Sequence, residues 1–129
     1  MCIIGETMSL SNDELLSNIK RQSKRLSKSI NLPLRQAQYH LAKFVYQCDD
    51  WVHLRDSLKS DSFDNQLLLL ASLQPNSDSF LYKLLNENLA NISFNIKENT
   101  GENLPIDQVE KIIINIFGIE HSDFIRKIQ

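Results

Sequence analysis

Apolar residues recur at intervals of three and four along nearly the whole chain, and this helical period is what most limits its possible folds. Between residues 12 and 30, for example, Leu15, Ile19, Leu26 and Ile30 fall within a narrow arc at about 100° per residue. The 129 residues include only three glycines and three prolines, so little interrupts the pattern. The sequence therefore predicts an all-α fold, a compact bundle of six or seven helices.

Local signals place the helix boundaries. Ser11 and Glu14 have the spacing of a capping box, and Pro33 suits the first position of a helix, where its missing N–H is no loss. The segments expected to be helical are 12–30, 33–46, about 51–58, 66–73, 79–90, 105–117 and 122–128. Residues 92–96 alternate between apolar and polar side chains, which predicts at most one minimal strand or an extended connection.

The apolar stripes of these helices define the expected core. The residues predicted to lie in it are Leu26, Leu34, Ala37, Leu41, Phe44, Trp51, Leu54, Val109, Ile113, Ile116 and Phe124.

A sequence similarity between two segments of the chain suggests two diverged helix-turn-helix pseudo-repeats, at about 11–60 and 78–129. Residues 31–37 read Asn-Leu-Pro-Leu-Arg-Gln-Ala, and residues 103–109 read Asn-Leu-Pro-Ile-Asp-Gln-Val. After a one-residue shift in the following loop, Trp51 matches Phe124. The alternative is that two amphipathic helices that begin with proline look alike by chance. Both alternatives are compatible with a flexible N-terminal tail at 1–10 and one helical domain at 11–129.

Composition favours a cytoplasmic protein that does not span a membrane. The longest apolar run, residues 67–71, is far shorter than the roughly 20 residues that a membrane helix needs. The N-terminus has no basic segment of the kind that begins a secretory signal, and two cysteines do not suggest a disulfide framework.

Positive charge is concentrated in the first half of the chain. Residues 1–60 hold nine Lys or Arg and six Asp or Glu, whereas residues 61–129 hold five and ten. Six basic residues and no acidic one lie between positions 20 and 35, namely Lys20, Arg21, Lys24, Arg25, Lys28 and Arg35. If the protein binds an acidic partner or a nucleic acid, these side chains are the expected contact face. The alternative is a solvated face that promotes solubility.

No catalytic, cofactor or metal site is predicted. His40, Cys48 and His53 lack the paired spacing of a zinc site, and both histidines are expected on partly exposed helix faces. Asp49 and Asp50 beside Cys48 would raise the pKa of its thiol, the opposite of what activates a nucleophile. Asp49 or Asp50 is instead expected to cap a helix.

The first half also resembles a known module, on four matching segments. They are Lys20-Arg-Gln-Ser-Lys-Arg-Leu26, Leu32-Pro-Leu-Arg-Gln-Ala-Gln38, Leu41-Ala42 and Trp51-Val-His-Leu54. These resemble the short helical module of bacterial glyoxalase-related proteins and of small plasmid or accessory-gene proteins. The resemblance covers residues 20 to about 58 and departs from the module in having Gln47 and Cys48 where the loop glycine stands. It implies a small helical unit and carries over no catalytic or metal position.

These observations favour a non-enzymatic accessory protein that binds a macromolecule, most simply a protein, through a helical surface. The alternative function is nucleic-acid binding by the basic residues at 20–35, as in helix-turn-helix proteins. The sequence does not indicate the oligomeric state.

Overall fold

The structure, a computed structural model, describes residues 12–59, 65–100 and 103–129 and confirms the all-α prediction. Within these ranges every regular element is helical. The elements are α2 (Asn12–Ser29), α3 (Leu34–His40), the π-helix η1 (Leu41–Val45), α4 (Trp51–Lys59), the 3₁₀-helix η2 (Gln66–Ser72), α5 (Ser79–Thr100), α6 (Ile106–Ile116) and α7 (His121–Ile128). The predicted tail at 1–10 and the Ser11 end of the capping box lie outside the described residues.

Residues 92–96 are a correction to the sequence analysis, which expected a minimal strand or an extended connection there. Helix α5 runs without a break through residues 92–96. Leu85, Leu89, Ile92 and Ile96 are all buried, and their spacing of four, three and four residues follows one helical face. The longer helical pattern therefore outweighs the short alternation.

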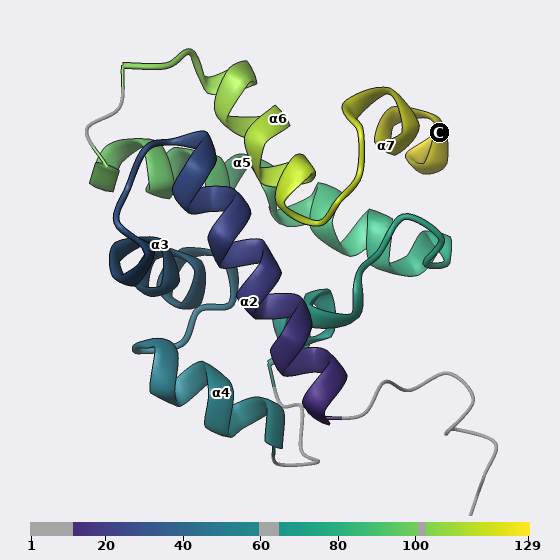
Figure 1. Cartoon of the computed structure of the whole chain (residues 1–129). Coiled ribbons are helices and arrows are strands. Elements are labelled where there is room, and N and C mark those ends of the chain that lie inside the picture. Colours follow the sequence, from purple (N-terminus) through teal and green to yellow (C-terminus); the bar gives the residue numbers. More distant parts are fainter. Residues whose placement is uncertain (1–11, 60–64, 101–102) are drawn as a thin grey trace, which may run out of the picture.

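Helices α2 and α5 are the two long elements around which the others pack. Helix α2 contacts α3, α4 and α6, and α5 contacts α6, α7 and η1. In Figure 1, α3 and α4 lie on one side of α2, while α6 and α7 lie toward the other. The apolar stripe of α2 is buried as predicted, with Leu15, Ile19, Leu26 and Ile30 in the core.

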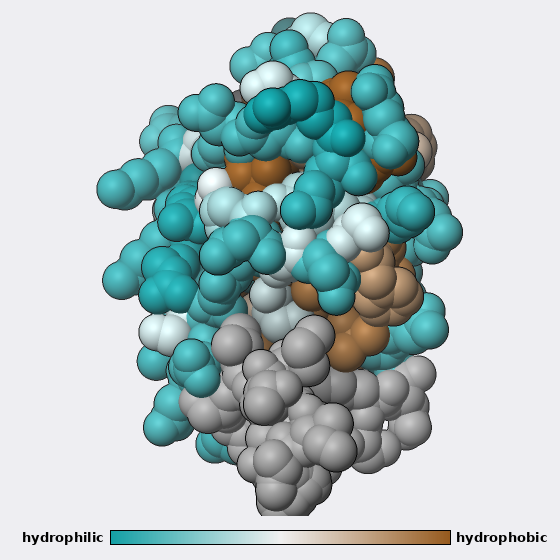
Figure 2. All heavy atoms as spheres, turned by 90° about the vertical axis from the view of Figure 1, so that its right-hand side faces the viewer, coloured by the Kyte–Doolittle hydropathy of each residue, from teal (hydrophilic) through white to brown (hydrophobic). Residues whose placement is uncertain are grey.

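Most of the predicted core is buried, and the face of the molecule drawn in Figure 2 is mainly hydrophilic. The residues below one-tenth exposure are Leu26, Ala37, Leu41, Leu54, Val109, Ile113, Ile116 and Phe124. Phe44 and Trp51 are only half-buried and pack against the edge of this core. Leu34 is a correction, because it is 41% exposed. It is the first residue of α3, so its side chain points back beyond the helix end, away from the stripe that begins at Ala37.

The two halves share a helix order and a cap geometry. Each has a long helix, then Asn-Leu-Pro, a second helix and a short third helix. Pro33 has φ −56° and ψ 146°, and Pro105 has φ −60° and ψ 152°. The proline carbonyls accept from the N–H groups of Ala37 at 3.0 Å and Val109 at 3.2 Å. A common origin stays a prediction, but the local geometry at both starts is the same.

The likeness extends into the long helices at a spacing of 70 residues. Leu15, Asn18 and Ser23 of α2 stand in register with an identical residue of α5, Leu85, Asn88 and Ser93 respectively. Both serines are fully buried. The two long helices therefore present the same residue to the core at the leucine and serine positions, whereas Asn18 is buried and Asn88 is half-buried.

The π-helix accounts for a difference in length between the halves. Tyr46 N donates to Leu41 O at 3.2 Å, which is the i to i+5 bond of a π turn and accommodates one extra residue. Each second helix is then followed by a positive φ, 56° at Gln47 and 80° at Gly118. Phe124 is the fourth residue of α7, and the fourth residue of α4 is Leu54. By helix position Phe124 thus matches the buried Leu54 rather than Trp51.

Candidate functional site

Helix α2 carries five of the six basic residues predicted to form a contact face. Lys20, Lys24 and Lys28 are exposed and recur every four residues, so they form one stripe along the helix. Arg21 is also exposed, and Arg25 is half-buried. These five residues are called the basic face below. Its position follows from the burial of the apolar stripe on the opposite side of the same helix.

Arg35, the sixth predicted residue, lies on a different helix. It is the second residue of α3 and is exposed. Only residues 30–33 separate α2 from α3, so Arg35 lies near the C-terminal end of α2, the end that carries Lys28.

The basic face has no charge partner among the described residues. The ion pairs in these ranges are Arg55 with Asp56 and Arg126 with Asp123, and His53 Nδ1 also lies 3.7 Å from Asp49 Oδ2. None of them involves one of the six basic side chains. Positive charge on α2 is therefore left for solvent, counterions or a partner.

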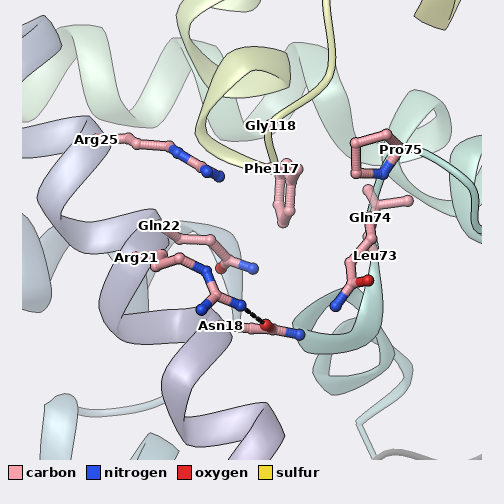
Figure 3. Close-up of a pocket in the computed structure, with 9 residues that line it drawn as sticks. All are labelled: Asn18, Arg21, Gln22, Arg25, Leu73, Gln74, Pro75, Phe117 and Gly118. Carbon is pink, nitrogen blue, oxygen red and sulfur yellow. Dashed lines mark hydrogen bonds between the residues drawn. The ribbon is translucent and has the colours of Figure 1, made fainter.

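A pocket of about 220 Å³ opens beside α2. Helix α2 supplies one wall, the segment 73–75 supplies another, and Phe117 and Gly118 after helix α6 supply a third (Figure 3). The α2 residues that line it are Asn18, Arg21, Gln22 and Arg25. The pocket thus joins one edge of the basic face to the second half of the chain.

Hydrogen bonds to the surrounding protein fix the polar side chains of this wall. Arg25 Nη1 donates to Ile116 O at 3.0 Å, at the C-terminal end of α6. Arg21 Nη2 donates to Asn18 Oδ1, and Asn18 Nδ2 donates to Ala71 O at 2.8 Å. A carbonyl or amide group of the fold therefore holds each arginine in place.

Gln22 is almost fully buried, at 2% exposure, and Tyr46 sets its orientation. The Tyr46 hydroxyl donates to Gln22 Oε1 at 2.6 Å. Burial raises the pKa of the Tyr46 hydroxyl, so it remains a protonated donor. Because Oε1 is engaged by Tyr46, the amide nitrogen is the end that faces the pocket (Figure 3).

Gly118 lets the third wall approach Arg25. Its φ of 80° lies in the left-handed region, which disfavours other residues. A Cβ at this position would lie 3.2 Å from Arg25 Nη1. The glycine therefore serves both the turn and the placement of the guanidinium.

The charged side chains that line the pocket are all positive. Its lining residues include two guanidinium groups and no carboxylate. A neighbouring hollow shares Asn18, Arg21 and Gln74 and adds Asp13 and Glu14 from the first turn of α2. The charge along α2 thus changes from acidic at its N-terminal end to basic at the pocket.

The residues weighed for metal or nucleophilic chemistry are dispersed or enclosed. His40 is 9% exposed, which corrects the expectation of a partly exposed face, because its ring stacks on Phe44 with centroids 5.4 Å apart. Burial lowers the pKa of His40. Cys48 is buried, and burial first, then the charges of Asp49 and Asp50, raise the pKa of its thiol. In the described ranges no three His, Cys, Asp or Glu side chains gather as metal ligands would.

Asp50 caps α4 as expected, with Oδ1 accepting from His53 N at 2.8 Å. The exposed His53 accepts from Asp49 N through Nδ1 at 2.9 Å, so this histidine belongs to the same turn. Both aspartates therefore have a local structural role.

Sequence reasoning found the arginines of the pocket and missed its other walls. Asn18 and Gln22 are polar residues on the inner side of an amphipathic helix, which is the one local signal that something polar lies there. The sequence predicts the end of one helix at residue 73 and of another at residue 117, and it assigns no functional role to Gln74, Pro75 or Gly118. Their meeting with α2 depends on tertiary packing.

Comparison with known proteins adds no relative. No family model, curated protein or solved structure matches the chain. The resemblance of residues 20–58 to the short helical module therefore stays a prediction. Across the part of the chain that the structure describes, no helix combines the length and apolar character needed to cross a membrane.

Proposed function

We propose that the chain is a non-enzymatic binding protein and that its basic face docks an acidic segment of a protein partner. The observation that carries this proposal is the positive charge of α2, which has no ion-pair partner in residues 12–59, 65–100 and 103–129 and where Lys20, Lys24 and Lys28 are exposed. Opposite charges steer partners together and favour one orientation of docking.

Helix α5 provides an internal comparison that supports the proposal. At the 70-residue spacing, the five residues of the basic face match Ala90, Asn91, Phe94, Asn95 and Glu98. Helices α2 and α5 share the register of their core residues, but α5 does not carry the positive charge of α2. Helix α5 thus forms in this fold without a basic face. The charge on α2 is therefore not needed for a long helix to fold, which favours a role in binding.

Burial of the Cys48 thiol and its raised pKa support the non-enzymatic part of the proposal, since an attacking cysteine needs an accessible thiolate. The nearest imidazole in sequence, that of His53, is engaged in the cap of α4.

A capture experiment with matched variants tests the proposal. The test variant replaces Lys20, Lys24 and Lys28 by Ala. The control variant replaces Lys43, Lys83 and Lys111, which are exposed lysines on other helices, and makes the same change in net charge. We expect a partner captured from the cells that make this protein to be retained by the control and lost by the test variant. Equal capture by both variants would place the docking surface elsewhere.

Nucleic-acid binding is the second candidate, because exposed lysines at four-residue spacing also suit a phosphate backbone. Each phosphate contact contributes about −0.9 to the log–log slope of affinity against salt, so four contacts give a slope near −4. Fluorescence anisotropy with labelled duplex DNA measures this slope. No binding even near 50 mM salt, where electrostatic attraction is strong, would eliminate this candidate.

A further inference from the structure

We infer that the pocket beside α2 binds the phosphate group of a phosphorylated side chain on the protein partner, an inference that rests on the proposed function. The pocket is the point at which the basic face becomes concave. It would therefore hold one charged group of the partner, while Lys20, Lys24 and Lys28 contact the partner residues around that group.

Three donor side chains of α2, those of Arg21, Gln22 and Arg25, line the pocket. Arg21 and Arg25 each have five N–H donors, and the bonds to Asn18 Oδ1 and Ile116 O use one from each. The amide nitrogen of Gln22 is directed inward (Figure 3). Arginine forks suit phosphate oxygens, and several donors around one point suit a group with three acceptor oxygens.

The donors are held in place before any ligand arrives. Gln22 is 2% exposed and anchored by Tyr46, while Arg25 is anchored on the end of α6. Groups that are already oriented lose little conformational entropy on binding. An ordinary surface arginine has no such support.

Charge favours a phosphate monoester over a carboxylate. The monoester carries a charge of about −1.5 to −2 near pH 7, against −1 for a carboxylate. The pocket offers two guanidinium groups and no lining carboxylate to oppose a dianion.

The walls favour a terminal phosphate over the diester of a nucleic-acid backbone. Leu73 to Pro75 stand across from α2, and Phe117 and Gly118 close a third side. A monoester has one covalent connection and can enter end-on. A diester continues in two directions and would meet these walls.

The test is a nuclear magnetic resonance titration of the full chain with small probes. The probes are N-acetyl-phosphoserine amide, inorganic phosphate, N-acetyl-glutamate amide and dimethyl phosphate. We expect the first two to shift the Gly118 amide and the arginine side-chain signals in a saturable way. Phosphoserine should bind about tenfold or more tightly than either the glutamate probe or the diester, because its second charge strengthens the charge-assisted hydrogen bonds to the guanidinium groups.

Charge-matched variants separate the pocket from general charge. Arg21→Gln should weaken phosphoserine binding by about tenfold. Lys83→Gln makes the same charge change at an exposed residue of α5, outside both the basic face and the pocket lining, so it should change the affinity by less than about twofold. Arg25→Lys, which keeps the charge but not the fork, should weaken binding with the fold intact by circular dichroism.

Several outcomes would overturn the inference. They are equal affinity for monoester and diester, equal effects of Arg21→Gln and Lys83→Gln, or no shift at Gly118. If the titration shows no phosphate binding at the pocket while partner capture still depends on Lys20, Lys24 and Lys28, the proposed function stands without a phosphate site. If the titration succeeds and capture does not depend on the lysines, the proposed function fails while the pocket remains an anion site.

Discussion

The hydrogen bond between Tyr46 and Gln22 connects the stability of the fold with the shape of the pocket, and Tyr46→Phe isolates it. Tyr46 is fully buried, and its hydroxyl donates to Gln22 Oε1 at 2.6 Å. The substitution keeps the ring and leaves the oxygen of Gln22 buried without this donor. An unsatisfied buried polar group costs about 1–3 kcal/mol, so the free energy of unfolding should fall by that amount.

Urea unfolding followed by circular dichroism measures the loss, which corresponds to about 3–5 °C in melting temperature per kcal/mol. Tyr82→Phe is a matched control, because the Tyr82 ring is also buried, at 2% exposure, but the bond from its hydroxyl to Pro75 O at 2.5 Å is only partly buried, so its loss should cost less. Tyr46→Phe should also weaken phosphoserine binding, since Gln22 loses its anchor. An unchanged free energy of unfolding would refute the account of how Gln22 is held.

Three further predictions concern the core and its titration. The lowered pKa of His40 means that the unfolded chain binds a proton more readily, so stability should be constant above about pH 6.5 and fall as the pH drops below it. His40→Phe, which keeps the stack on Phe44, should flatten that decline in unfolding experiments between about pH 7 and 5. Phe124→Ala should reduce the free energy of unfolding by about 3–5 kcal/mol, because the ring is 1% exposed and stacks on Tyr82. Trp51→Ala should cost clearly less than Phe124→Ala in the same assay, because Trp51 is half-buried; an equal loss would contradict the difference in burial.

The all-α class and the inner face of α2 could be predicted because they depend on local periodicity. Leu15, Ile19, Leu26 and Ile30 are buried as their spacing requires. The same reasoning failed for residues 92–96, where a short alternation coincides with a longer helical pattern. It also failed for Leu34, because a periodic stripe does not show that a first helical residue points past the helix end.

The basic face could be predicted and the pocket could not. A run of basic residues without an acidic one is visible in the sequence, and amphipathicity places it outside. The approach of Gly118 to Arg25 joins segments 93 residues apart, and the bond from Asn18 to Ala71 spans 53 residues. Such contacts come from packing α2 against α6 and η2, which single-sequence periodicity does not encode.

The most direct test of the central claim is calorimetric titration of the captured partner with the two triple-lysine variants at about 0.05 M and 0.3 M salt, which spans strong to weak screening of surface charge. The account predicts that the control variant (Lys43, Lys83 and Lys111 to Ala) keeps the affinity and salt dependence of the unmodified protein. The variant that removes Lys20, Lys24 and Lys28 should bind about tenfold or more weakly at low salt and lose most of the salt dependence. Equal affinity and equal salt dependence of the two variants would contradict a docking role for the basic face of α2.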